Sequence, residues 1–96
     1  MYTFIVNPNA KTGLGYQVWS SLEAILKEKN VNYQVFFTKY QKHATRLAQK
    51  LTQESGAKTL IVLGGDGTIN EVINGIKNPS KVTLGYIFNT IDHFIQ

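Results

Sequence analysis

A glycine-rich segment of the sequence has the residue types needed to bind phosphate. It reads Gly64-Gly65-Asp66-Gly67-Thr68. Glycine tolerates positive φ angles and carries no side chain, so the backbone N–H groups of such a segment can approach a ligand closely. A helix that begins at the same place adds unpaired N–H donors and a partial positive charge. We therefore predict that this glycine-rich loop, residues 64–68, binds phosphate.

Asp66 is the residue of the glycine-rich loop that phosphate binding alone does not explain. A carboxylate inside such a loop repels phosphate unless a cation or a proton transfer is involved. Asp66 could hold Mg²⁺, directly or through water, or accept a proton from an attacking hydroxyl group. An aspartate that bonds to the amides of a tight turn is the structural alternative. The residue types leave these interpretations open.

Thr68 and Glu71 also have a purely structural interpretation. The run Thr68-Ile69-Asn70-Glu71 has the spacing of a capping box, in which the threonine caps a helix and the glutamate reaches back to it. This predicts that Thr68 is the cap of a helix. A nucleotide contact by Thr68 is compatible with that role, because its hydroxyl would lie beside the same unpaired donors.

Polar residues follow two other apolar runs of the sequence. Asn7, Pro8 and Gly13 come after the first run, and Thr38 and His43 come after the second. The first of these segments lacks the spacing of a Walker A loop. Ligands of open parallel sheets bind beyond the carboxyl ends of the strands, so both segments are candidates for nucleotide contacts. His43 is interpreted as a helix cap or surface residue rather than a catalytic base.

The apolar periodicity predicts the elements that position these residues. Strand patterns cover residues 2–6, 31–37, 59–63 and 82–88, and the third of them is continuously apolar, as in a strand buried on both faces. Helical spacing follows Gly15, covers residues 42–54 until Ser55-Gly56, and returns from Ile69 to Ile76. The order β-α-β-α-β-α-β predicts an α/β fold with three layers, α-β-α, a mostly parallel sheet and right-handed crossovers.

Composition narrows the class of protein. The chain has 96 residues and no cysteine, which fits one domain and excludes disulfides and thiolate metal sites. No apolar run reaches the ~18 residues that span a bilayer, so we expect a soluble, cytoplasmic protein. The net charge of +4 comes from scattered lysines and one arginine, which predicts a solvated surface and no nucleic-acid partner.

Apolar residues crowd the end of the chain. They are Tyr86, Ile87, Phe88, Ile91, Phe94 and Ile95. Because a domain normally covers such a segment with a further helix, we expect the chain to be truncated at its C-terminal end. Packing on the sheet, or self-association into a homo-oligomer through this tail, are the alternatives. The adjacent Asp92 and His93 are not predicted to form a metal site, since neighbouring residues rarely coordinate one metal.

Taken together, these motifs resemble the N-terminal half of the diacylglycerol kinase catalytic domain family, which includes bacterial lipid kinases and sphingosine kinases. The resemblance covers residues 4 to about 87. The glycine–aspartate motif alone is shared with NAD kinases, but the combination is more specific. The matching residues are Asn7-Pro8 with Gly13, Thr38 with His43-Ala44, the glycine-rich loop, Asn70-Glu71 and Asn74-Gly75.

This resemblance implies an ATP-binding domain, residues 1–96, of the NAD kinase and diacylglycerol kinase-like type. By carry-over, Asp66 would be catalytic, organising Mg²⁺ or assisting deprotonation of a lipid hydroxyl. ATP, Mg²⁺ and a diacylglycerol-like lipid would be the ligands, with contact to the membrane surface as a peripheral protein. The residues implied in ATP binding are Asn7, Pro8, Gly13, Thr38, Gly64, Gly65, Gly67, Thr68 and Glu71.

The sequence departs from the family after the fourth strand. The family has a Pro-x-Gly-Thr/Ser-x-Asn-Asp-Phe motif there, whereas residues 88–94 lack its proline and glycine. The resemblance does not extend to the C-terminal β-rich domain of the family, so these 96 residues alone are expected to have little or no kinase activity. The alternatives are an NAD kinase-like phosphotransferase, a non-catalytic module for nucleotide binding or self-association, and a flavodoxin-like domain of unrelated function.

Overall fold

A computed structural model describes residues 1–53 and 58–88 of the chain. Strands and helices alternate along it in the predicted order. The elements are β1 (Tyr2–Val6), α1 (Ala10–Glu28), β2 (Tyr33–Phe37), α2 (His43–Leu51), β3 (Lys58–Gly64), α3 (Asp66–Gly75), a short 3₁₀ turn η1 (Pro79–Lys81) and β4 (Val82–Phe88). Helix α2 ends at Leu51 with Thr52 as its C-cap, so the helix predicted over residues 42–54 is too long at its C-terminal end. Residues 55–56 and the tail beyond residue 88 lie outside the described residues.

The four strands form a parallel sheet in the order β2-β1-β3-β4. Val6 lies opposite Phe37 of β2 on one side and Leu63 of β3 on the other. The carboxyl ends of β1, β2 and β3 therefore meet at one edge of the sheet. This confirms the predicted α/β fold and places the polar segments after these strands side by side.

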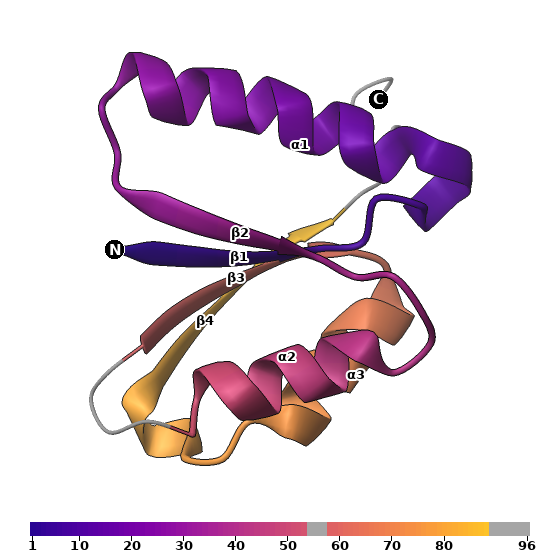
Figure 1. Cartoon of the computed structure of the whole chain (residues 1–96), viewed down its shortest axis with the longest axis vertical. Coiled ribbons are helices and arrows are strands. Elements are labelled where there is room, and N and C mark those ends of the chain that lie inside the picture. The colour runs from indigo at the N-terminus through magenta and orange to yellow at the C-terminus, as the bar shows by residue number, and fades with distance from the viewer. Residues whose placement is uncertain (54–57, 89–96) are drawn as a thin grey trace.

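Helices cover both faces of the sheet, as Figure 1 shows: α1 lies on one face, and α2 and α3 lie on the other. Each side has its own buried cluster, because alternate residues of a strand point to opposite faces. Trp19 of α1 is buried against Phe4, Val6 and Leu63 of the sheet. Ile5, Ala44, Ala48, Leu60, Val62 and Val72 are buried on the other side. The three predicted layers are confirmed.

Helix α1 begins earlier than the sequence pattern indicated. It starts at Ala10, so Gly13 and Gly15 lie inside the helix instead of before it. A glycine costs a helix about 1 kcal/mol relative to alanine. Trp19 is buried against Phe4, and the centroids of the two rings lie 5.0 Å apart. This burial outweighs the cost of a glycine, because a large buried side chain contributes about 2–3 kcal/mol. None of the described helices is long and apolar enough to cross a membrane.

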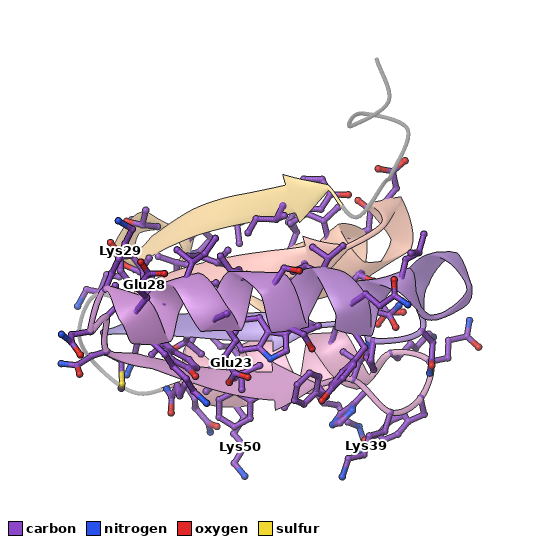
Figure 2. All side chains as sticks on the ribbon, turned by 90° about the horizontal axis from the view of Figure 1, so that it is seen from above. Glu23, Glu28, Lys29, Lys39 and Lys50 are labelled. Carbon is purple, nitrogen blue, oxygen red and sulfur yellow. The ribbon has the colours of Figure 1, made fainter. Side chains whose placement is uncertain are left out.

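Helix α1 is also tied to the edge strand β2 by a hydrogen bond. The Tyr33 hydroxyl donates to Glu23 Oε2 over 2.6 Å. Glu23 projects from α1 above β2 in Figure 2. This hydrogen bond, together with burial and the negative charge of Glu23, raises the pKa of Tyr33 above its ordinary value.

Helices α2 and α3 pack closely where Gly75 meets α2. A Cβ atom on Gly75 would overlap the carbonyl oxygen of Thr45 and would lie 3.0 Å from the Cβ of Ala48. The Thr45 hydroxyl donates to the Glu71 carbonyl over 2.8 Å, which fixes the two helices at this distance. Gly75 is therefore required by the packing of the helices and not by a turn.

We predict that Gly75→Ala lowers the free energy of unfolding by about 1–3 kcal/mol, because the added methyl group must push α2 and α3 apart. Gly67→Ala is the matched control in the same helix, since a Cβ on Gly67 meets nothing within 4 Å. It should leave stability unchanged or raise it by up to about 1 kcal/mol. Urea unfolding followed by circular dichroism measures both, and equal effects of the two substitutions would contradict this packing.

Stability should also fall at alkaline pH. The folded state raises the pKa of Tyr33, so its contribution is complete below the unfolded value of about 10 and is lost as pH rises through the folded value. Tyr33→Phe and Glu23→Gln should each flatten the decline of melting temperature above about pH 10, because the first removes the phenol and the second removes the negative charge that disfavours its ionisation. A decline as steep as in the unchanged chain would show that the contact is not formed in solution.

Candidate functional site

A pocket of about 520 Å³ lies beyond the carboxyl ends of β1, β2 and β3. Three segments far apart in the sequence form its walls: the end of β1, the loop between β2 and α2, and the first turns of α3. This is the position at which open parallel sheets bind ligands. The lining residues are Asn7, Asn9, Thr38, Lys39, Tyr40, Gln41, Gly65, Gly67, Thr68 and Glu71.

Six of the residues that the sequence singled out line this pocket. They are Asn7, Thr38, Gly65, Gly67, Thr68 and Glu71. Pro8, Gly64 and Asp66 lie next to lining residues without lining the pocket themselves, and Gly13 lies within α1. The lining residues Asn9, Lys39, Tyr40 and Gln41 were missed. Thr38 was singled out because it follows the end of a strand, and these four residues also lie just after strand ends.

The predicted capping box at Thr68 and Glu71 is wrong. Helix α3 begins at Asp66, its N-cap is Gly65, and no side chain caps it. Thr68 Oγ1 instead accepts a hydrogen bond from Asn7 Nδ2 over 3.2 Å, and Glu71 Oε2 accepts the backbone N–H of Lys42 over 3.1 Å. Both side chains serve contacts with other elements, which the local spacing could not reveal.

The glycines of the loop have different reasons to be glycine. None has a φ angle in the left-handed region, so the expected use of positive φ is not what selects them. A Cβ on Gly64 would lie 2.8 Å from Thr68 Oγ1, so Gly64 makes room for that side chain. A Cβ on Gly65 or Gly67 would meet nothing within 4 Å. The space beside these two glycines is therefore empty, and a side chain there would meet no neighbouring atoms.

The first turn of α3 offers backbone donors to this space. Its first intrahelical hydrogen bonds run from the N–H groups of Thr68 and Ile69 to the Gly65 carbonyl, over 3.1 and 3.2 Å. The N–H groups of Asp66 and Gly67 precede these bonds, in the part of a helix where amides have no intrahelical partner. An anion beside Gly65 and Gly67 would meet them and the positive end of the helix dipole.

Tyr40, which lines the pocket, forms an aromatic pair with His43. The rings of Tyr40 and His43 are stacked, with centroids 4.3 Å apart and planes inclined by 13°. His43 Nδ1 accepts the backbone N–H of Lys39 over 2.9 Å, so this nitrogen carries no proton. His43 therefore orders the loop before α2, in agreement with its interpretation as a structural residue. Tyr40 is 55% exposed and presents a flat apolar surface at the pocket.

Asp66 lies on the other side of the glycine-rich loop, next to strand β4. Its neighbour there is Tyr86, whose Cα is paired with Val62 of β3 and whose hydroxyl lies 3.4 Å from the Gly64 carbonyl oxygen. Burial raises the pKa of Tyr86, and the Asp66 carboxylate raises it further through its charge and a hydrogen bond. Sequence reasoning counted Tyr86 only among the apolar residues of the tail and missed this contact.

The charged groups near the pocket are few. Lys39 lines it, and Figure 2 shows that Lys39 and Lys50 extend beyond β2, whereas Lys29 lies beside Glu28 at the far end of α1. Within residues 1–53 and 58–88, no group of three or more His, Cys, Asp or Glu side chains could hold a metal ion. The described side chains therefore do not build a metal centre by themselves.

The chain is similar to lipid kinases over most of its length. It is 40% identical over 86 residues to the Bacillus subtilis protein YtlR, which is named as a candidate lipid kinase. The matched segment covers 88% of this chain and 28% of the relative. It is 30% identical over 92 residues to the diacylglycerol kinase of Staphylococcus carnosus, covering 94% of this chain and 30% of the relative.

A solved structure of a candidate diacylglycerol kinase from Bacillus anthracis has the same fold, with a TM-score of 0.69 and 28% identity over 92% of this chain and 32% of that chain. The chain thus spans less than a third of the length of each of these proteins. Residues 1–88 match the model of the diacylglycerol kinase catalytic domain. The chain therefore belongs to the diacylglycerol kinase catalytic domain family.

Proposed function

We propose that this chain is the ATP-binding part of a lipid kinase, which transfers the γ-phosphoryl group of ATP to the hydroxyl group of a diacylglycerol-like lipid. Membership of the diacylglycerol kinase catalytic domain family supports a kinase function. The observation that carries the role in ATP binding is the open space at Gly65 and Gly67, where the pocket meets the first turn of α3. A side chain would fill this space without disturbing the fold, and a phosphate group fits it.

Thr68 adds a directed donor at the phosphate end of the proposed site. Its oxygen already accepts a hydrogen bond from Asn7, whose own amide oxygen is held by the N–H of Asn9 over 3.1 Å. The Thr68 hydroxyl proton therefore remains available to a phosphate oxygen. Donors that are fixed before the ligand arrives stabilise phosphate charge without reorganisation during the reaction.

The loop between β2 and α2 offers a place for the rest of the nucleotide. Tyr40 is held against His43, and an exposed aromatic face stacks on a planar base with a gain of about 1–3 kcal/mol. Thr38, Lys39 and Gln41 supply polar groups beside it. The volume of about 520 Å³ lies within the range of about 300–1,000 Å³ that is usual for small-molecule sites.

Mg²⁺ fits this site only as a companion of the ATP phosphates. Among the described residues, Glu71 is the acidic side chain that lines the pocket, and one of its oxygens accepts the Lys42 N–H. Mg²⁺ commonly binds through one or two carboxylates together with substrate phosphates, so Glu71 and the phosphates would hold it. When bound, the ion would neutralise part of the phosphate charge.

Asp66 is proposed as the proton acceptor. In the proposed reaction the lipid oxygen forms a bond to the γ-phosphorus while the bond from that phosphorus to the bridging oxygen breaks, and ADP leaves. The proton of the lipid hydroxyl passes to the Asp66 carboxylate. Because Asp66 lies on the β4 side of the loop and not in the pocket, the lipid would approach from that side.

Because the chain spans less than a third of its relatives, the lipid site is proposed to need a second wall that these residues do not supply. The chain alone is then expected to bind ATP with little or no transfer. Contact with a membrane surface, where the lipid is found, is part of the same proposal. An NAD kinase-like reaction and a non-catalytic nucleotide-binding module remain the competing functions.

We predict that Gly65→Val weakens binding of Mg·ATP to the chain at least tenfold, because the valine side chain fills the space proposed for phosphate. The melting temperature should hardly change, since a Cβ at this position meets no neighbour within 4 Å. Isothermal titration calorimetry measures the affinity. Ser20→Val, on the exposed surface of α1, is the matched control and should bind as the unchanged chain does. Equal affinity in Gly65→Val would overturn the assignment of the phosphate site.

We predict that Asp66→Asn lowers kcat by about 10²–10⁴-fold, as expected for loss of a general base. Transfer can be measured in a chimera in which this chain replaces the matching 86-residue segment of the Bacillus subtilis relative, with labelled ATP and either diacylglycerol or NAD as acceptor. Label in diacylglycerol supports the lipid kinase, and label in NAD supports the alternative reaction. An active chimera whose kcat is unaffected by Asp66→Asn would exclude Asp66 as the proton acceptor.

A further inference from the structure

A second pocket lies where the edge strand β2 meets α2, and it shares no lining residue with the pocket beside the glycine-rich loop. Its volume of about 420 Å³ lies within the range of about 300–1,000 Å³ that is usual for small-molecule sites. We call it the edge pocket. The described residues that line it belong to β2, α2 and the first position of β3: Gln34, Phe36, Leu47, Lys50, Leu51 and Lys58.

The alternation of side chains along β2 explains the apolar surface in the edge pocket. Tyr33, Val35 and Phe37 pack against the buried cluster on the α1 side of the sheet. Gln34 and Phe36 therefore point to the opposite face, which α2 and α3 cover in Figure 1. Phe36 is half-buried and belongs to neither of the two clusters. Its ring thus offers apolar surface to a ligand in the edge pocket.

Helix α2 supplies the other wall of the edge pocket. Leu47 and Leu51 are four residues apart and Lys50 follows Leu47 by three, so these side chains lie on one face of the helix. The two leucines pack against the buried cluster on this side of the sheet and also line the pocket. Lys50 is exposed, and Figure 2 shows it extending beyond β2. The pocket therefore combines an apolar floor with a positive charge at its rim.

Gln34 is a polar group that is held in place at the edge pocket. Its Nε2 donates to Thr3 Oγ1 over 2.9 Å, and the two residues lie opposite each other in the pairing of β2 with β1. Thr3 is buried, so a contact inside the protein fixes the direction of the amide. A side-chain amide has two N–H donors, of which one serves Thr3. The second can donate to a ligand in the pocket.

The charges around the edge pocket favour an anionic ligand. Lys50 and Lys58 line it, and the described lining includes no acidic residue. The acidic residues within 1–53 and 58–88 lie in α1, on the opposite face of the sheet, or toward the start of α3: Glu23, Glu28, Asp66 and Glu71. An apolar floor with cations at its rim is complementary to a molecule that has an apolar chain and an anionic head group.

We propose that the edge pocket binds the anion of a fatty acid. The acyl chain lies on Phe36, Leu47 and Leu51, the carboxylate meets Lys50 at the rim, and the Gln34 amide adds a donor. Each methylene group that leaves water strengthens binding, and a carboxylate forms charge-assisted hydrogen bonds that a neutral head group does not. Because the edge pocket is separate from the pocket beside the glycine-rich loop, this inference does not depend on the proposed function.

The first experiment measures binding of octanoate, decanoate and dodecanoate to the chain by isothermal titration calorimetry, below the concentrations at which they form micelles. Affinity should rise about two- to fourfold with each added methylene that the pocket buries. Decanol has a chain of the same length without the charge, and it should bind at least threefold more weakly than decanoate. Acetate should not bind. Equal affinities of decanoate and decanol, or of octanoate and dodecanoate, would overturn the proposal.

The second experiment tests the charge at the rim. Lys50→Gln should weaken binding of decanoate at least threefold and leave binding of decanol unchanged, because it removes the charge but not the apolar floor. Lys29→Gln changes the net charge equally at the far end of α1 and is the matched control. It should bind decanoate as the unchanged chain does. An equal loss in the two variants would show a response to overall charge and would contradict the site.

The third experiment locates the ligand and tests the floor. In nuclear magnetic resonance spectra of the unchanged chain, decanoate should shift the backbone amide signals of Phe36, Leu47 and Lys50 and leave that of Gly65 in place. Phe36→Thr keeps a residue type that strands favour and should weaken decanoate and decanol alike, with the melting temperature as the check on folding. Signals that shift only outside the edge pocket would refute the proposal, whatever the stability of the variant.

Discussion

The parallel pairing of β1 with β3 determines where every part of the candidate site lies. β3 is buried on both faces, since Leu60 and Val62 pack beneath α2 and α3 while Leu63 packs beneath α1. Because the strands are parallel, their carboxyl ends meet at one edge of the sheet, and the crossover connections return the chain to the opposite edge. The register that sets Val6 opposite Leu63 also brings Asn7 to Thr68, and the hydrogen bond between them joins the first strand to the glycine-rich loop.

The sequence was sufficient to predict the layers and the strands, because burial imposes a simple period on them. The continuous apolar run of β3 indicated a strand covered on both sides, and helical spacing indicated α2 and α3. The start of α1 was not predictable in the same way. Gly13 and Gly15 locally favour a break in the helix. The packing of Trp19 on Phe4, which is distant in sequence, outweighs this local preference, and the helix runs through both glycines.

The candidate site was predictable by position but not by contact. The rule that ligands bind beyond strand ends pointed to Asn7, Thr38 and the glycine-rich loop, and these residues meet at the pocket. The partners of the side chains were out of reach, because they are distant in sequence: Asn7 and Thr68 are 61 residues apart, and Lys42 and Glu71 are 29 apart. A local capping pattern cannot compete with such contacts once the chain is folded.

The acidic residue of α3 that lines the pocket shows why such distant partners matter for chemistry. Glu71 accepts the backbone N–H of Lys42. This donor is neutral, so it fixes the direction of the carboxylate without cancelling its charge, whereas the side chain of a lysine would do both. A carboxylate that faces a ligand can then keep both its charge and its place.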